Sequence, residues 1–272
     1  MSRTIRYAVK LSAFLTFGIL LFIIGYILFR GLPYLTQSLF SMKYTSENVS
    51  MLPSIITTVM LVFLTLLVAT PIGIFTGFYL IEYAKKGNKL VELIRIATET
   101  LSGIPSIVYG LFGMLFFVIR LGFQYSLLAG TLTAGIMILP LIIRSTEEAL
   151  LSVDDSLREA SFGLGAGKLR TIFRVVLPVA MPGILSGIIL SIGRVVGETA
   201  ALMFTLGTST KVPNALLHSG ASGRTLALHM YMLSSEGMHV NESYATGVIL
   251  LIIVLLINGL STFISNKLTK GR

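Results

Sequence analysis

The sequence of 272 residues contains no cysteine and only three histidines. The absence of cysteine excludes disulfide bonds and thiolate metal sites in this chain. The histidines His218, His229 and His239 are ten or eleven residues apart, which is not the spacing of metal ligands. We therefore expect ordinary loop histidines and no metal site. No Ser/His/Asp set and no paired carboxylates are apparent, so the sequence predicts no catalytic residues and no enzyme.

Charged residues are also scarce: they make up 12% of the chain, whereas hydrophobic residues make up 54%. A soluble domain of this length would need more charged surface. No polar stretch is long enough to fold as a separate soluble domain. The formal net charge is +9, which we attribute to basic residues flanking membrane spans rather than to nucleic-acid binding. These features indicate an integral membrane protein.

Apolar runs of membrane-spanning length recur along the chain,. We predict an all-α, multi-pass protein with six spans, roughly over residues 8–29, 53–81, 93–119, 126–143, 183–206 and 245–266. The first run is too long for the apolar part of a typical signal peptide and lacks an A-x-A site, so we expect it to be retained as a span. Residues 1–45 then hold the N-terminal tail, the first span and an outside linker, 46–266 the core, and 267–272 a tail.

Lys and Arg are distributed unequally between the two sides of these spans. With the N-terminus in the cytoplasm, fifteen lie inside, five outside and one, Arg194, within a span. This asymmetry predicts that both termini are cytoplasmic. The longest cytoplasmic loop would cover residues 144–182, and the longest outside segment residues 207–244.

The cytoplasmic loop reads "EEALLSVDDSLREASFGLGAGKLRTIFRVVLPVAMPGIL". Ser152 and Asp155 fit a capping box, which predicts a helix from about Val153. Leu157, Ala160, Ser161 and Leu164 would form one small, mostly apolar face of that helix. Gly163, Gly165 and Gly167 should end it, before a second, basic helix around 168–176. Two interpretations remain open: the pair docks into a groove of a partner, or it lies on the lipid surface.

The run "EASFGLGAGKLRTIFRVVLP" resembles the EAA loop of ABC-importer permeases. The matching positions are Glu159, Ala160, Ser161, Gly165, Val175, Leu177 and Pro178, with Ser161 in place of the second alanine and Val175 in place of the usual isoleucine. The resemblance implies a coupling helix that sits in a cleft of a separate ATP-binding subunit. Residues Glu159, Ala160, Ser161 and Gly165 would then transmit nucleotide-driven movement to the spans.

The segment "GLGAGKL" within this loop looks like a phosphate-binding loop. A Walker-type loop needs a glycine five positions before its Gly-Lys pair and Ser or Thr after it. Phe162 and Leu169 occupy those two positions. We therefore expect that this chain binds no ATP or other cofactor, and that ATP is used by a partner subunit.

Arg194 and Glu198 lie inside the apolar run "SIGRVVGETAALMF". A charge near the middle of a span is costly, so Arg194 should face a partner or a water-filled path. Glu198 should lie one turn further on the same face of this span, so that the two side chains can pair. The pair either stabilises the helix bundle or lines a substrate path, in which the guanidinium would bind an oxyanion and Glu198 would hold Arg194 when the path is empty.

Three segments resemble the permeases of the bacterial phosphate-specific ABC importer, and most of all the A-type permeases. They are "GRVVGETAALMFT" (193–205), "SGIPSIVYGLFG" (102–113) and "LPLIIRSTEEAL" (139–150). The resemblance covers spans two to six and makes 46–266 an ABC permease core. One departure is Asp154, where the family usually has proline.

The resemblance implies a permease subunit of an ATP-driven phosphate importer in a bacterial or archaeal cytoplasmic membrane. Its expected partners are a second homologous permease, two ATP-binding subunits and an extracytoplasmic phosphate-binding protein. Three alternatives remain: a permease for another oxyanion such as sulfate, molybdate or phosphonate, a stand-alone secondary transporter, and a phosphate-sensing membrane protein.

Overall fold

The computed structural model describes residues 3–84, 87–214 and 219–270, and within these ranges all regular structure is helical. The elements are, in order, α1 (Arg3–Gly31), η1 (Leu32–Tyr34), η2 (Gln37–Phe40), α2 (Leu52–Phe78), η3 (Tyr79–Tyr83), α3 (Lys89–Ser102), α4 (Ser106–Gly113), η4 (Met114–Arg120), α5 (Leu127–Leu151), α6 (Asp155–Gly163), α7 (Lys168–Thr171), η5 (Ile172–Val176), α8 (Leu177–Val196), α9 (Ala200–Met203), α10 (Leu226–Glu236) and α11 (Val240–Lys270). The elements η3, η4 and η5 are π-helical and continue neighbouring helices.

Five helices are long and apolar enough to cross a membrane, and a sixth span is added if the bent pair α3–α4 counts as one. The expected multi-pass, all-helical fold is therefore confirmed. The third span, expected over 93–119, is bent by 107° between α3 and the α4–η4 helix. The bend lies in "SGIPS". The ring of Pro105 disfavours the helical conformation of the residue before it, and proline itself has no N–H to donate.

The fifth span differs more from its expected limits of 183–206. One continuous helix runs from Lys168 to Val196 through α7, η5 and α8. Pro178 does not interrupt this helix. It stands in the first turn of α8, directly after the π-helical turn η5, which shifts the hydrogen-bond register,. The connecting segment under the bundle is consequently only residues 152–167, instead of the expected loop over 144–182.

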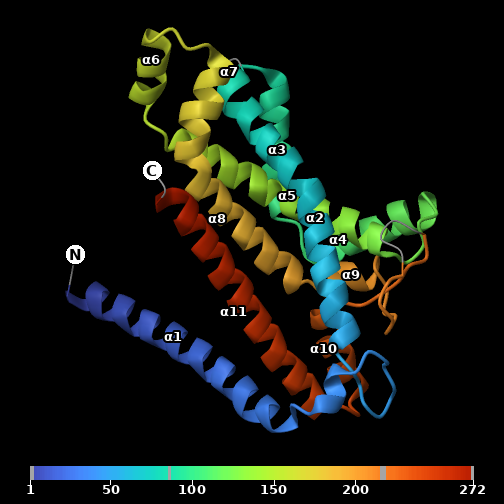
Figure 1. The fold of residues 1–272 in the computed structure, drawn as a ribbon. Helices are drawn as coiled ribbons and strands as arrows, with labels where there is room; N and C mark the ends of the chain where they lie inside the picture. Colours follow the sequence, from blue (N-terminus) through green and yellow to red (C-terminus); the bar gives the residue numbers. More distant parts are fainter. Residues whose placement is uncertain (1–2, 85–86, 215–218, 271–272) are drawn as a thin grey trace.

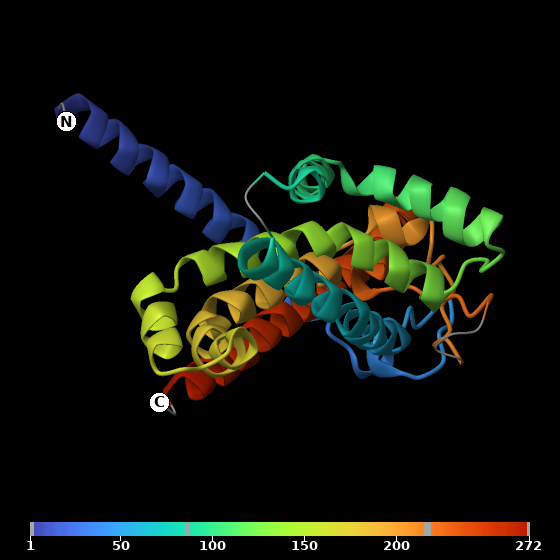
Figure 2. The same cartoon turned by 90° about the horizontal axis from the view of Figure 1, so that it is seen from above.

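The centre of the bundle is α5, of whose most apolar window 67% is buried. Small residues let α2 and α8 approach it: a Cβ atom at Gly73 would lie 2.6 Å from Ile142 of α5, and one at Gly183 would lie 2.7 Å from Ala149. By contrast, none of the corresponding window of α1 is buried. Figures 1 and 2 both show α1 diverging from the bundle towards its N-terminal end.

The two ends of the bundle differ in what they carry. The helices α6 and α7, the start of α1 and the end of α11 lie towards one end, and α10 lies at the other (Figure 1). The segment that contains η2 packs against α10 and α11 through a core that includes Leu39, Met51, Leu226 and Ala245. The assignment of the end with α6 and α7 to the cytoplasm, and with it the cytoplasmic location of both termini, stays a prediction.

The expectation of three ordinary loop histidines is wrong for His229, which lies in α10 and is 0% exposed. His239 lies in the turn before α11, with its Nδ1 3.8 Å from a carboxylate oxygen of Glu242, and His218 lies outside the described residues. His229 Nε2 lies 3.2 Å from the carbonyl oxygen of Val49 and donates to it as a neutral ring,. Burial, and then the Arg224 cation, lower the pKa of His229 from 6.5 to about 3.

The buried His229 predicts that the folded protein loses stability in mild acid. Its folded-state pKa lies below its ordinary value, so the unfolded chain binds the proton more readily,. The free energy of unfolding should fall by about 1.4 kcal/mol per pH unit as the pH drops below 6.5, and level off near pH 3,. Melting temperatures in detergent between pH 7.5 and 5 would measure this, with His229→Gln as the variant that lacks the slope. An equally steep slope in His229→Gln would contradict the prediction.

Candidate functional site

The segments 102–113 and 193–205 meet inside the bundle, where α4 crosses α9. A Cβ atom at Gly110 would lie 2.7 Å from the Cα atom of Ala201, so the two backbones are in direct contact. Tyr109 is 4% exposed and belongs to the same core cluster as Val195 and Leu202. Two sequence motifs that are about ninety residues apart therefore form one structural unit.

Arg194 lies in the last turn of α8, partly buried at this crossing. A cation is favourable there because the helix dipole is negative at the C-terminus. The hydroxyl of the neighbouring Tyr109 donates to the carbonyl oxygen of Leu101 at 2.6 Å. Within the described residues, the guanidinium makes no ion pair. The donors of Arg194 are therefore available to an anion.

Glu198 is not on the same helix as Arg194, contrary to the expectation from the sequence. Helix α8 ends at Val196, and Thr199 has φ −124° and ψ −55°. Glu198 is 8% exposed, and its Oε1 accepts a hydrogen bond of 3.0 Å from the backbone N–H of Ala201. It therefore caps the start of α9, and no ion pair with Arg194 is present among the described residues. Gly197 stands at this helix end with φ −85°, and glycine is among the residues least favourable to helix continuation.

A cavity of about 550 Å³ lies beside this crossing. Helices α1, α4, α10 and α11 and the residues that follow Glu198 form its mostly apolar walls, with Thr199, Met203, Tyr231 and Tyr244 among the lining residues. The sequence did not indicate this cavity, nor did it single out Tyr109. The available signal was the position of Tyr109 in "SGIPSIVYG", between the helix break and the small residue that allows the crossing.

Helix α6 is capped by Asp154, and not by the Ser152–Asp155 capping box expected from the sequence. Asp154 accepts a hydrogen bond of 2.8 Å from the backbone N–H of Ser156 and caps α6. The hydrogen bonds from Ser156 lower the pKa of the Asp154 carboxyl. Ser152 instead donates to the carbonyl oxygen of Ala149 at 2.8 Å, at the end of α5. Asp154, which replaces the family's usual proline, thus starts the helix itself.

Of the residues to which the EAA resemblance assigns a coupling role, all but Ser161 are exposed. Glu159 and Ala160 are exposed on α6, and the Ser161 hydroxyl lies 2.9 Å from that of Thr171 and ties α6 to α7. Gly165 has φ +79°, a conformation that other residues adopt at a cost. Beside it, Leu164 is 90% exposed. The loop thus presents an apolar tip to its surroundings.

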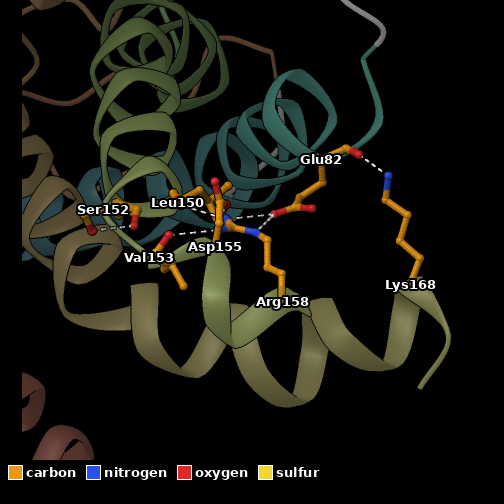
Figure 3. Close-up of polar contacts among 8 residues, drawn as sticks. Glu82, Leu150, Ser152, Val153, Asp155, Arg158 and Lys168 are labelled. Atoms are coloured by element: carbon orange, nitrogen blue, oxygen red, sulfur yellow. Dashed lines mark hydrogen bonds and ion pairs between the residues drawn. The ribbon is translucent and has the colours of Figure 1, made fainter. Parts of the chain in front are cut away.

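The inner side of the loop is held by Arg158, which the sequence analysis did not single out (Figure 3). Its guanidinium forms an ion pair of 3.2 Å with Glu82 in η3. It also donates to the carbonyl oxygens of Leu150 and Val153, at 2.9 and 2.8 Å, and to Asp155 at 3.0 Å. Lys168 donates to the carbonyl oxygen of Glu82, and its ammonium lies 4.7 Å from the centre of the Tyr83 ring.

Comparison with known families gives a match over residues 69–270 to the family described as binding-protein-dependent transport system inner membrane component. A probable ABC transporter permease protein, YqgI of Bacillus subtilis, is 38% identical over 77% of this chain and 76% of its own length. The phosphate transport system permease protein PstA 1 of Mycobacterium tuberculosis is 37% identical, over 75% of this chain and 66% of its own. PstA of Yersinia pestis is 36% identical, over 74% and 67%.

Solved structures with the same fold include two ABC transporters. The inward-facing MetNI methionine transporter matches with a TM-score of 0.63 at 22% identity, over 80% of this chain and 93% of the matched one. A bacterial alginate transporter in complex with a periplasmic protein matches with a TM-score of 0.71 at 17% identity, over 98% and 95%. At these identities the likeness concerns the fold alone.

Proposed function

The chain belongs to the family of binding-protein-dependent transport system inner membrane components, and on that premise we propose that it is the permease subunit of an ATP-driven importer of inorganic phosphate. Its similarity to phosphate transport permeases over about three quarters of its length carries the proposal. The segments that meet at Arg194 and Tyr109 are the same segments in which the sequence resembles those permeases.

Arg194 is the residue we assign to the anion. A guanidinium offers a planar set of donors that matches two oxygens of phosphate, and Arg194 makes no ion pair within the described residues. Glu198 caps α9 and so holds that helix beside Arg194. We assign the ion pair between Arg194 and Glu198 to a different conformation of residues 197–199. In that conformation Glu198 would replace the anion at Arg194, so that binding of the anion to Arg194 stays reversible.

The partners follow from the same proposal. The exposed apolar tip of the coupling loop would dock on an ATP-binding subunit, with one such subunit for each of two permeases, and ATP would be hydrolysed there. The second permease would close the open side of the cavity beside α4, α9 and α11, and an extracytoplasmic phosphate-binding protein would deliver the anion. This chain itself would bind no cofactor or metal and would catalyse no covalent reaction.

The test is phosphate uptake into vesicles that contain this chain, its co-purifying membrane and ATPase partners and the cognate binding protein. We expect uptake of labelled phosphate that requires ATP and is competed by unlabelled phosphate but not by sulfate or molybdate. Competition by sulfate or molybdate would indicate a permease for another oxyanion. Flux without ATP would indicate a secondary transporter, and partner binding without any flux a sensor.

Docking of the ATPase subunit should depend on the apolar tip. Leu164→Asp places a carboxylate where an apolar side chain, 90% exposed in this chain, would be buried by the partner. Burying a leucine contributes about 1.5–3 kcal/mol, so we expect at least about tenfold less ATPase to co-purify with the variant. Met238→Asp is the control, because Met238 is an equally apolar residue, 77% exposed, at the other end of the bundle. Equal loss in both variants would contradict a specific docking role.

A further inference from the structure

Arg158 joins three helices through one side chain. A guanidinium has five N–H donors, and the five hydrogen bonds that Arg158 makes use all of them. Its acceptors belong to the end of α2–η3, to the end of α5 and the turn after it, and to α6 itself. Figure 3 shows these acceptors converging on the guanidinium from above α6, on the side of α2 and α5.

The ion pair at the centre of this contact is shielded from water. The side chain of Arg158 is 15% exposed and that of Glu82 is 10% exposed. Removing one partner of a buried ion pair strongly destabilises the packing around it, because the remaining charge stays buried without an opposite charge. Lysine is a poor replacement for Arg158, since its three donors on a single nitrogen do not reach acceptors on three elements.

Glu82 also meets the next helix of the loop. Lys168, the first residue of α7, donates to the backbone carbonyl of Glu82 and lies over the ring of Tyr83. From Lys168 a single helix of 29 residues leads to Val196, a length of about 43 Å at 1.5 Å per residue. Arg194 lies in its last turn. The helix that carries the proposed anion residue therefore begins beside the Arg158–Glu82 pair.

We infer that the Arg158–Glu82 pair is the mechanical link through which movement of α6 reaches the spans, and that Arg158 is a positioning residue for transport. The inference rests on the proposed function, in which an ATPase subunit moves α6. With the pair intact, α6 moves together with the ends of α2 and α5. Without it, α6 follows the ATPase while the spans stay behind, so that ATP is hydrolysed without import.

The experiment measures two quantities in the complete transporter: the number of anions imported per ATP hydrolysed, and hydrogen exchange at the backbone amides of Ser156 and Leu157. The variants are Arg158→Met, Arg158→Lys and Glu82→Gln. Arg170→Met is the control, because Arg170 is exposed in the neighbouring helix α7 and forms no ion pair in the described part of the chain. ATPase co-purification verifies that each variant assembles.

For Arg158→Met we expect at least about a tenfold lower import per ATP, with ATPase bound to within about twofold of the unchanged protein. Exchange at Ser156 and Leu157 should be at least about tenfold faster. Arg158→Lys should resemble Arg158→Met in both quantities, and Glu82→Gln should give values between those of Arg158→Met and the unchanged protein. An unchanged import per ATP in Arg158→Met, or full activity of Arg158→Lys, would overturn the inference, as would a parallel loss of uptake and hydrolysis.

The exchange measurement separates this inference from the proposed function. If the unchanged complex imports no phosphate, the proposed function fails, and the exchange at Ser156 and Leu157 still tells whether Arg158 fixes α6 to the bundle. Unchanged exchange in Arg158→Met would overturn the link whatever the imported anion is.

Discussion

Replacing Arg194 with methionine is expected to lower ATP-driven phosphate uptake about 100-fold or more, with a near-normal amount of the chain in the membrane. Two charge-assisted hydrogen bonds to an anion are worth about 1.5–3 kcal/mol each, and 1.4 kcal/mol corresponds to a factor of ten. Abundance should be maintained because Arg194 makes no ion pair in the described residues, so its removal leaves no carboxylate without a partner.

Two further variants show whether charge alone or the shape of the guanidinium matters. Arg194→Lys keeps the cation but loses bidentate binding, so we expect phosphate uptake about tenfold below that of the unchanged protein, and above that of Arg194→Met. Arg120→Met removes an exposed cation at the end of η4 and should leave uptake unchanged. Initial rates of labelled phosphate uptake measure all three. Normal uptake by Arg194→Met at normal abundance would remove Arg194 from the path.

The second large effect is expected at Gly110, where α4 touches α9. In Gly110→Ala the new Cβ atom would lie 2.7 Å from the Cα atom of Ala201, and neither backbone can move without shifting its helix. Overpacking of this kind costs about 1–3 kcal/mol, and Gly110→Val, with two more carbon atoms, should cost more. Because α4 carries Tyr109 and α9 follows the Arg194 turn, we expect uptake to be lost along with stability.

A glycine without such a contact provides the matched control. At Gly135 in α5, an added Cβ atom would meet nothing within 4 Å, and alanine is about 1 kcal/mol more favourable than glycine inside a helix. Gly135→Ala should therefore be neutral or slightly stabilising. Melting temperature and phosphate uptake of the two alanine variants test the pair. Equal behaviour of Gly110→Ala and Gly135→Ala would show that the α4–α9 crossing is not tightly packed.

Much of the fold was predictable from the sequence, because a lipid-facing helix must be apolar along a span's length. Five of the six spans anticipated on this basis are present, and all six if the bent pair α3–α4 counts as one span. The end of α6 at Gly163 and the turn at Gly165, with φ +79°, also agree with the expectation from glycine chemistry. The limits of the helices were less predictable, since α7 continues through η5 and Pro178 into α8.

The tertiary structure alone decided which residues meet. Periodicity placed Glu198 one turn beyond Arg194, whereas the helix end at Val196 turns it to cap α9. The partner of Arg158 is Glu82, which is 76 residues away in the sequence. A local sequence pattern indicates which face of each helix is apolar, because this periodicity depends only on neighbouring residues. The contact between two helix ends depends instead on how the helices pack around α5, and that is a property of the whole chain.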